Sequence, residues 1–268
     1  MAMPGPSPPD VPVFILCGGL GTRLGETSQL RPKPMVEIGD RPLLAHIMGL
    51  YDRHGFRRFV LCTGHRGDVI STYFLNFTAL HSDFTVETRT RSVSYHQTGY
   101  VPDWEVTVAH TGMRAMTGAR IARAAARHLG DAEHFAVTYG DGLTDADLAD
   151  ELAWHLAHDR LGTVLAVNPP SQFGRLELRE DGGAAFEEKA IVRDDWVNGG
   201  FFFFRRGFLD YLSTEEDCVL EERPLARLAA DGQLGVYRCA GFWACMDTLR
   251  DRERMVGLWE TGAAPWQG

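Results

Sequence analysis

The chain has 268 residues, 44% of them hydrophobic, and a formal net charge of −9. This length and composition can bury a sizeable core, as one large α/β domain or as two small ones. A surface so acidic repels the phosphate backbone of nucleic acids, which excludes them as expected partners. No stretch approaches the roughly 18 uninterrupted apolar residues of a membrane span, so we expect no membrane partner either.

The N-terminus and the cysteines bear on the compartment. Residues 1–11 are rich in proline and lack the basic-then-apolar pattern of a secretory signal. We therefore expect a disordered leader, followed by one domain over residues 12–268. The five cysteines are scattered and form no C-x-x-C pair, which favours neither a zinc site nor a disulfide framework. Reduced thiols predict a cytoplasmic protein.

Strand patterns alternate with helix patterns along the chain. Short apolar or alternating runs predict strands over residues 12–17, 59–63, 85–95, 105–109, 135–139, 163–167 and 234–239. Apolar residues at helical spacing predict helices over residues 43–54, 68–77, 117–129, 145–158, 220–230 and 247–259. These elements predict an α/β fold: a Rossmann-like, mixed and mostly parallel sheet flanked by helices. Short strands with turns over residues 173–204 predict a β-rich insertion in the second half.

A glycine-rich loop follows the first expected strand and has the sequence Gly18-Gly19-Leu20-Gly21-Thr22-Arg23-Leu24. Glycines let the backbone turn sharply and direct successive N–H groups at one point, which suits a phosphate chain. The loop lacks the Gly-Lys-Ser/Thr of a Walker A motif, and Leu24 replaces the third glycine of a dinucleotide-binding motif. The alternative is a turn without a ligand. Its place at the carboxyl edge of a parallel sheet favours a ligand.

Lysine is almost absent from this chain. Only two of the 27 cationic residues are lysine, Lys33 and Lys189. A chain so biased towards arginine is expected to keep lysine where arginine fails, for example in a crowded phosphate site that needs a compact ammonium on a flexible stem. The alternative is the chance survival of two ordinary surface lysines. We favour the first explanation, which marks both residues as candidate phosphate ligands.

Two aspartates are candidate metal ligands. Asp141 ends an expected strand between Gly140 and Gly142, and Asp247 lies at the start of the last expected helix. The alternatives are a turn aspartate for Asp141 and a helix N-cap for Asp247. Two carboxylates far apart in sequence can together hold Mg²⁺, which takes one or two protein carboxylates plus substrate phosphates.

At these residues the chain resembles the sugar-1-phosphate nucleotidylyltransferase family, and most of all its glucose-1-phosphate cytidylyltransferase branch. The first matching blocks are the glycine-rich loop and Lys33-Pro34-Met35-Val36-Glu37-Ile38-Gly39. Further blocks follow in family order: Met116-Thr117-Gly118, Thr138-Tyr139-Gly140-Asp141-Gly142, Phe173-Gly174, Glu188-Lys189, Asn198-Gly199-Gly200-Phe201-Phe202 and Met246-Asp247-Thr248-Leu249-Arg250-Asp251. Small departures occur at Ala115, Ala119 and Ala190.

The resemblance implies roles for individual residues. It assigns Arg23 and Lys33 to the neutralisation of charge at the reacting phosphates, and Asp141 and Asp247 to Mg²⁺. It assigns nucleotide binding to Leu16, Gly18, Gly19, Gly21, Thr22, Arg23, Thr117, Gly118, Arg120 and Gly140. It assigns the sugar phosphate to Gly174, Glu188, Lys189 and Asn198. It also implies a homo-oligomer.

The reaction that the resemblance implies joins α-D-glucose 1-phosphate to CTP and gives CDP-glucose and pyrophosphate. No general base is required, because the attacking phosphate is already an anion at pH 7. The histidines are scattered accordingly, and we expect His155 and His158 on a solvated helix face. Two alternatives stay open: the same reaction with another base (dTTP or UTP) or another sugar 1-phosphate, and an inactive regulatory subunit that binds nucleotide sugars. Retention of all five candidate charged groups favours an enzyme.

Overall fold

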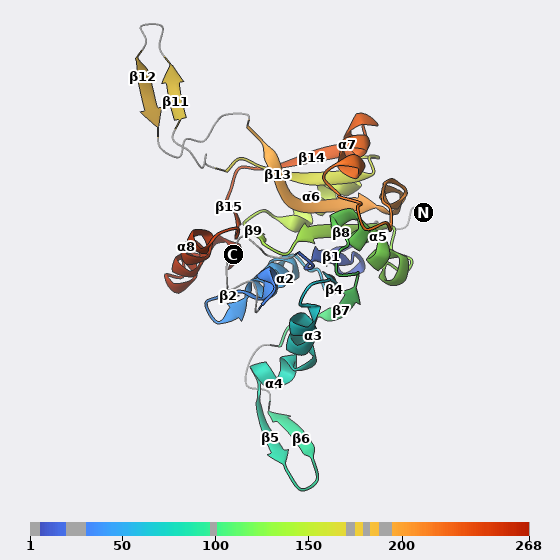
Figure 1. The fold of residues 1–268 in the computed structure, drawn as a ribbon, viewed down its shortest axis with the longest axis vertical. Helices are drawn as coiled ribbons and strands as arrows, with labels where there is room; N and C mark the ends of the chain where they lie inside the picture. Colours follow the sequence, from blue (N-terminus) through green and yellow to red (C-terminus); the bar gives the residue numbers. More distant parts are fainter. Residues whose placement is uncertain are drawn as a thin grey trace.

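The computed structural model describes residues 6–19, 31–96, 101–169, 175–178, 183–187 and 195–267. A seven-stranded sheet forms the centre of the molecule (Figure 1). In order along the sheet, its strands are β14 (Leu234–Cys239), β10 (Gly162–Val167), β13 (Val197–Arg205), β8 (His134–Tyr139), β1 (Val13–Leu16), β4 (Arg58–Thr63) and β7 (Glu105–His110). Among these seven described strands, only β13 pairs antiparallel with its neighbours. The mixed, mostly parallel sheet predicted from the sequence is thus confirmed.

Helices cover both faces of this sheet. One face carries α2 (Leu43–Arg53), α3 (Gly67–Leu75) and α6 (Leu148–Leu156), and α8 (Leu249–Glu260) joins the same core through Met255. The other face carries α5 (Thr117–His128), α7 (Arg223–Ala230) and the 3-10 helix η4 (Arg206–Tyr211). Every residue of β1 is buried, because a parallel strand with helices on both sides has no solvent face.

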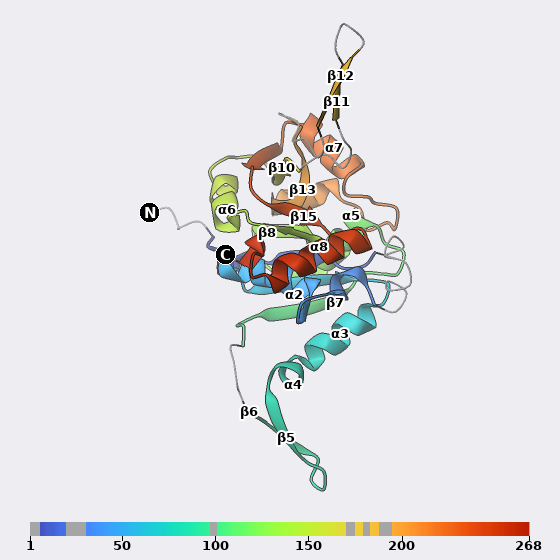
Figure 2. The same cartoon turned by 90° about the vertical axis from the view of Figure 1, so that its left-hand side faces the viewer.

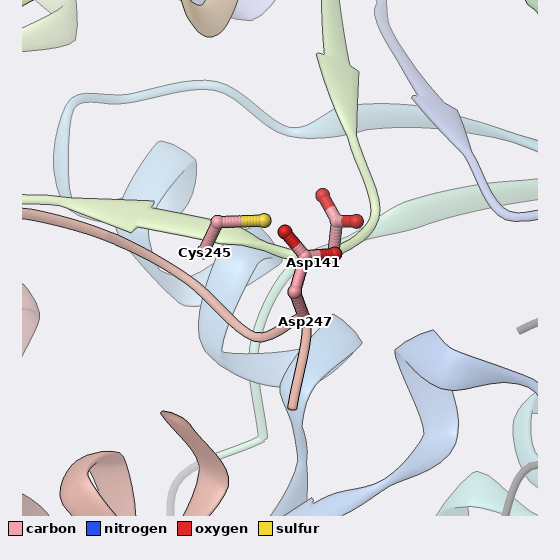
Figure 3. Close-up of side chains that lie close together, drawn as sticks. All are labelled: Asp141, Cys245 and Asp247. Carbon is pink, nitrogen blue, oxygen red and sulfur yellow. The ribbon is translucent and has the colours of Figure 1, made fainter. Parts of the chain in front are cut away.

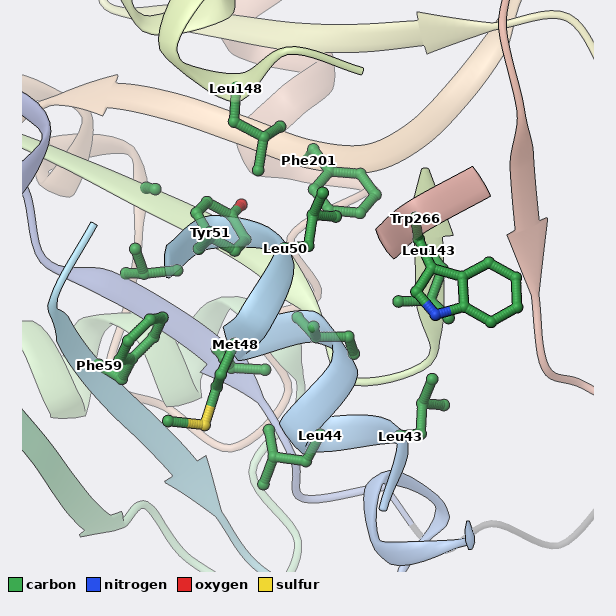
Figure 4. Packing of buried hydrophobic residues seen from close by; sticks show 14 of the residues in the cluster. Leu43, Leu44, Met48, Leu50, Tyr51, Phe59, Leu143, Leu148, Phe201 and Trp266 are labelled. Atoms are coloured by element: carbon green, nitrogen blue, oxygen red, sulfur yellow. The ribbon is translucent and has the colours of Figure 1, made fainter. Parts of the chain in front are cut away.

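Strand β13 fixes the two halves of the core. Its four consecutive phenylalanines, Phe201 to Phe204, are at most 1% exposed. Because side chains alternate along a strand, Phe201 and Phe203 pack with α2 and α6, and Phe202 and Phe204 pack under η4 and α7. Figure 4 shows the first of these clusters around α2. Burial of each ring is worth about 1.5–3 kcal/mol, so this strand anchors both layers.

Four two-stranded ribbons complete the described part of the fold. Two lie near the carboxyl edge of the sheet: β2 (Glu37–Ile38) with β3 (Arg41–Pro42), and β9 (Gly142–Thr144) with β15 (Trp243–Cys245). The other two, β5 (Asp83–Glu87) with β6 (Ser92–His96) and β11 (Arg175–Leu178) with β12 (Ala184–Glu187), project from opposite ends of the molecule (Figures 1 and 2). The short segments α4 (Phe77–His81), η3 (Lys33–Met35) and η5 (Pro265–Gln267) connect or end the larger elements.

The first departure from the sequence-based expectations is the segment over residues 85–95, which is a hairpin and not one strand. Its turn contains neither glycine nor proline. It is made instead by Arg91 at φ 60° and by the Thr90 hydroxyl, which donates to the Glu87 carboxylate at 3.0 Å. The ordered chain also begins before residue 12, since Pro8–Asp10 form the 3-10 helix η1 and Val11 is fully buried.

The prediction that His155 and His158 lie on a solvated helix face is wrong. His155 is fully buried, because this face of α6 packs onto β10. Its Nδ1 lies 2.8 Å from the Thr163 hydroxyl and its Nε2 lies 3.1 Å from His134 Nδ1. Burial lowers the pKa of His155 to about 3, so the ring is neutral and structural.

Every helix of the described ranges is too short or too polar to span a bilayer.

A buried acid lies on the same helix. Glu151 is 0% exposed, and neither of its carboxyl oxygens has a hydrogen-bond partner among the described residues. Burial raises the pKa of Glu151 well above its ordinary value of 4.5. The folded protein therefore keeps this acid protonated to a higher pH than the unfolded chain, which releases the proton once the pH exceeds about 4.5. Wild-type stability consequently falls as the pH rises from that value towards neutrality.

We expect Glu151→Gln to stabilise the protein at pH 7 by up to about 3 kcal/mol, because an amide does not ionise in the unfolded chain. The gain should vanish near pH 4, where the acid is protonated in both states. Urea unfolding at both pH values measures it. Asp150→Asn, an exposed neighbour on α6, is the matched control and should change stability by no more than about 0.5 kcal/mol. An equal effect of Glu151→Gln at the two pH values would contradict the assignment.

Candidate active site

The candidate residues meet where the strand order reverses. From β1 the chain moves outward through β4 and β7, and then returns to β8 on the other side of β1. Strands β1 and β8 are parallel, so the loops after Leu16 and Tyr139 leave the sheet side by side. Such a switch point, at the carboxyl ends of parallel strands, is the usual ligand site of open α/β sheets.

A stiff segment presents Lys33 at this edge. Pro32 and Pro34 flank the lysine and fix the backbone of η3. The turn is closed by the Met35 N–H, which donates to the Pro32 carbonyl at 2.8 Å, and Met35 is buried as an anchor. The amino group of Lys33 therefore extends from a position with little backbone freedom.

Gly140 brings Asp141 to Lys33. The Gly140 N–H donates to the Leu16 carbonyl at 3.1 Å, which continues the β1–β8 pairing by one step. A Cβ at this position would lie 2.7 Å from the Leu16 oxygen and 2.7 Å from Pro34 Cγ, so a side chain does not fit. Glycine thus permits close approach of three segments: the end of β1, the Lys33 segment and the end of β8.

A ribbon brings Asp247 to the same place. β9 follows Asp141 directly and pairs with β15, with Cys245 opposite Gly142. The Met246 N–H then donates to the Asp141 carbonyl at 2.9 Å. The N-cap of α8 is Thr248, which forms a capping box with Asp251. Asp247 lies one residue before the cap, so the N-cap alternative for this aspartate is wrong.

Lys33 bridges the two carboxylates. Its Nζ lies 2.7 Å from Asp141 Oδ2 and 2.7 Å from Asp247 Oδ1. The side chains of Lys33, Asp141 and Asp247 are 16%, 27% and 45% exposed, so the cluster opens to solvent mainly at Asp247. Burial opposes the charge of Lys33, but attraction to Asp141 and the hydrogen bonds to both carboxylates raise the pKa of the ammonium. Two carboxylate oxygens placed around one cation also fit Mg²⁺, with its other positions left for water and phosphates.

Arg120 holds the neighbouring loops together. Its guanidinium donates to three backbone carbonyls, those of Gly18 at 2.8 Å, Thr63 at 3.1 Å and Gly112 at 2.8 Å. A Cβ on Gly18 would lie 2.1 Å from Arg120 Cζ, so the start of the glycine-rich loop packs against the guanidinium. Arg120 is 4% exposed. Within the described residues, Arg120 therefore binds the backbone of these loops. The sequence pattern did not indicate this structural role.

Thr117 and Gly118 begin α5 and contact a distant segment. The Thr117 hydroxyl donates to the Glu221 carboxylate at 2.8 Å and accepts from the Leu220 N–H at 2.9 Å. A Cβ on Gly118 would lie 2.7 Å from Cys218 Sγ. The two residues thus fix the N-terminus of α5 against residues 218–221.

Asn198 lies at the same edge of the sheet. β13 runs antiparallel to β8, so its first residues are found where β8 ends. Asn198 is exposed and its Oδ1 accepts from the Gly200 N–H at 2.8 Å. Next to it, the Tyr139 hydroxyl donates to the Glu221 carboxylate, and burial together with the charge of Glu221 raises the pKa of Tyr139.

The remaining candidates divide into two groups. Leu16 ends β1 and is buried, and Gly19 is exposed just beyond it. Six candidates lie outside the described residues: Gly21, Thr22, Arg23, Gly174, Glu188 and Lys189.

One residue of the cluster was not predicted. Cys245 lies in β15 two residues before Asp247, and a ligand atom of Asp141, Cys245 and Asp247 lies within 4.8 Å of each of the others. Figure 3 shows the three side chains converging. Burial and the charge of Asp141 raise the pKa of the Cys245 thiol. The only sequence signal for it was the i, i+2 spacing to Asp247.

Comparison with known proteins identifies the family. The nucleotidyl transferase family model matches residues 13–226. The chain belongs to this family. It is 42% identical to a glucose-1-phosphate cytidylyltransferase of Salmonella typhimurium, over 94% of this chain and 97% of that protein. It is 28% identical to a mannose-1-phosphate guanylyltransferase of Mycobacterium tuberculosis, over 95% of this chain and 66% of that protein.

Solved structures support the same fold. The structure of HddC from Yersinia pseudotuberculosis superposes with a TM-score of 0.65 at 19% identity, over 93% of this chain and 99% of that one. The same protein in complex with GMP-PN gives a TM-score of 0.63 at 18% identity, with the same coverage. The chain is thus a nucleotidyltransferase with the sheet architecture of these structures.

The bridged geometry predicts that Lys33→Arg is damaging although it keeps the charge. A planar guanidinium prefers to pair with one carboxylate through two parallel bonds, whereas the ammonium reaches two carboxylates from different directions. We expect kcat/KM for nucleotidyl transfer to fall at least ~10-fold, or about 1.4 kcal/mol, mainly through kcat. Steady-state pyrophosphate release measures it.

The matched control for Lys33→Arg is Arg31→Lys. It also exchanges the cation type, but on an exposed residue of the same segment that pairs with Glu37. We expect wild-type rates for Arg31→Lys and an unchanged melting temperature for both variants. A rate within twofold of wild type for Lys33→Arg would show that the site needs only a positive charge.

Proposed function

We propose that this chain joins glucose 1-phosphate to CTP and releases CDP-glucose and pyrophosphate. The observation that carries the proposal is the cluster of Lys33, Asp141 and Asp247 at the switch point of a nucleotidyltransferase fold. The choice of CTP and glucose 1-phosphate is supported by the cytidylyltransferases of Salmonella typhimurium and Salmonella typhi, which are 42% and 41% identical over 94% of this chain.

The reaction is an in-line substitution at phosphorus. A phosphate oxygen of the sugar 1-phosphate forms a bond to the α-phosphorus of CTP, and the bond from that phosphorus to the bridging oxygen of the β-phosphate breaks. Pyrophosphate leaves with the bonding electrons. The attacking oxygen is an anion at pH 7, because the second pKa of a phosphate monoester is about 6. The protein therefore needs to position two anions and neutralise their repulsion, and needs no general base.

The chain's own residues supply that neutralisation. Lys33 carries a fixed positive charge on a stiff segment at the end of β1 and β8. We propose that Asp141 and Asp247 hold Mg²⁺ when CTP is bound. Mg²⁺ would there screen the charge of the triphosphate and of the leaving pyrophosphate. The backbone of the glycine-rich loop, held through Gly18 by Arg120, would receive the triphosphate.

The residues outside the described ranges complete the proposal. We assign Gly21, Thr22 and Arg23 to the triphosphate, and Gly174, Glu188 and Lys189 to the sugar phosphate. Asn198, exposed at the same edge of the sheet, supports a sugar pocket beside β13. Thr117, Gly118 and Gly140 would line the nucleotide.

The alternatives differ from this proposal in defined ways. Another base or sugar would keep the same cluster, and the guanylyltransferase of Mycobacterium tuberculosis illustrates how such a change accompanies lower identity, 28%. An inactive regulatory subunit would not be expected to keep a bridging lysine and two carboxylates. The intact cluster therefore favours an active enzyme.

The proposal predicts a substrate preference. Pyrophosphate release should be measured for CTP, dTTP, UTP, ATP and GTP against glucose 1-phosphate, mannose 1-phosphate and galactose 1-phosphate. We expect kcat/KM for CTP with glucose 1-phosphate to exceed each other pair at least ~10-fold, as is typical when buried polar groups recognise a base edge. EDTA should abolish the activity and Mg²⁺ restore it. A preference for dTTP or UTP would move the protein to another branch, and no activity with any pair would overturn the proposal.

The thiols support a reducing compartment. All five cysteines are free, including Cys239 and Cys245, which are the closest pair in sequence. Free thiols in this number are typical of proteins in the cytoplasm, where we place the reaction.

We also propose that the protein is a homo-oligomer, joined through the β5–β6 hairpin. Cross-strand pairs Phe84–Tyr95 and Val86–Val93 form one face of this hairpin, and their four side chains are 46–50% exposed. The other face carries polar pairs such as Thr85–Ser94. A two-stranded ribbon is marginally stable alone in water, so we expect a partner to cover its apolar face. The apolar face of a second copy would cover this face, and a chain of net charge −9 does not favour a membrane or a nucleic acid as the partner.

The hairpin proposal predicts different effects on its two faces. Val86→Lys places a charge on the apolar face and should raise the dissociation constant of the oligomer at least ~10-fold, because an interface buries such a side chain without a partner. Thr85→Lys, one residue away on the polar face, is the matched control and should leave the mass unchanged. Light scattering after size exclusion gives the mass. A monomeric wild-type protein, or equal effects of both variants, would overturn the proposal.

A further inference from the structure

The carboxylate pair has a sulfur neighbour. Cys245 Sγ and one carboxylate oxygen each of Asp141 and Asp247 lie within 4.8 Å of one another. The pairing of β15 with β9 sets this position, since it places Cys245 opposite Gly142 and so beside Asp141. Cys245 ends β15 and Asp247 follows two residues later, and Figure 3 shows both side chains close to Asp141.

A thiol adds nothing to a magnesium site, because Mg²⁺ takes oxygen ligands. Sulfur ligands instead favour thiophilic divalent ions such as Zn²⁺ and Cd²⁺. Around a tetrahedral zinc, with bonds of about 2.0–2.3 Å, ligand atoms are roughly 3–4 Å apart. The three ligand atoms lie within 4.8 Å of one another, so binding would need small side-chain rotations that bring them closer. Asp247, whose side chain is 45% exposed, has the room to make them.

The charges also suit such an ion. Lys33 already fills the place between the two carboxylates with a single positive charge. Its stem is flexible, so the ammonium can withdraw. A divalent ion in its place would neutralise both carboxylates, and binding would release the thiol proton to solvent as the thiolate forms its bond to the metal.

We propose that Asp141, Cys245 and Asp247 form a binding site for thiophilic divalent ions of the Zn²⁺ and Cd²⁺ class. This ion would bind where the proposed reaction needs Mg²⁺, so it would compete with Mg²⁺ and stop nucleotidyl transfer. The competition rests on the proposed function. The binding itself does not, because all three ligands belong to the protein.

The binding test uses the full-length protein without nucleotide. Cd²⁺ is titrated into it, and the near-ultraviolet charge-transfer absorption of a cadmium–thiolate bond is followed. We expect this absorption to saturate at one equivalent in the wild type and to be absent in Cys245→Ser. Cys239→Ser is the matched control, since Cys239 is also half-buried and its thiol donates to one carboxylate, that of Asp145, at 3.7 Å. This control should keep the absorption.

Two further variants use the same readout and do not alter the thiol. Asp141→Asn and Asp247→Asn should each weaken Cd²⁺ binding at least ~10-fold, as is typical for the loss of a supporting ligand. Lys33→Met, which removes the competing ammonium, should tighten it. Retention of the absorption in Cys245→Ser, or unchanged Cd²⁺ affinity in both asparagine variants, would overturn the proposal.

A competition assay separates this proposal from the proposed function. If the wild type is active with CTP, the Cd²⁺ concentration that halves its rate is measured at several Mg²⁺ concentrations. This inhibitory concentration should rise as the Mg²⁺ concentration rises. At any one Mg²⁺ concentration, it should be at least ~10-fold higher in Cys245→Ser than in the wild type. Each variant is compared with its own rate in the absence of Cd²⁺. If no triphosphate supports activity, the proposed function fails, and the absorption titration still decides whether the ion binds.

Discussion

A single ammonium group holds together the three segments on which the site depends. Asp141 and Asp247 would repel each other, because one carboxylate oxygen of each lies within 4.8 Å of the other. Two unit charges about 4 Å apart cost roughly 4 kcal/mol at an effective dielectric constant of 20. Lys33, at 2.7 Å from each, offsets that repulsion. The neighbouring structure serves the same end, since the prolines stiffen the lysine segment and Gly140 lets it approach the end of β8.

Much of the fold could be predicted because its signals are local. Buried parallel strands give unbroken apolar runs, and glycine follows both β1 and β8, the strands at the switch point. Where the deciding contact is not local, the sequence was less informative. The turn over residues 88–91 has no glycine or proline, so the β5–β6 hairpin looked like one strand. His155 looked solvated because its partners, Thr163 and His134, lie on other elements.

The difference between local and non-local signals also explains which residues of the site could be predicted. The scarcity of lysine identified Lys33 as a candidate site residue, and its place at a strand end between two glycines identified Asp141. Asp247 could not be separated from a helix cap by its neighbours in sequence, because the separation depends on the pairing of β9 with β15 and on Thr248 as the cap. Arg120 carried no signal for its contacts with backbone carbonyls, and Cys245 carried almost none for its approach to the carboxylates.

The geometry gives a physical reason for lysine at position 33. Asp141 and Asp247 lie at the same end of the β9–β15 ribbon but on different strands, so two separate carboxylates meet the cation. An ammonium carries three N–H donors around one point, so it can give one to each carboxylate and keep the third for a phosphate oxygen. A guanidinium carries its donors in one plane and satisfies a single carboxylate best. If Asp141 and Asp247 hold Mg²⁺ in the proposed reaction, Lys33 would be left free to direct all three N–H donors to phosphate oxygens. The charged groups of this cluster are therefore already assembled before substrate binds. In the proposed reaction, an entering triphosphate would replace one charged partner of Lys33 with another, so no unpaired charge would be buried.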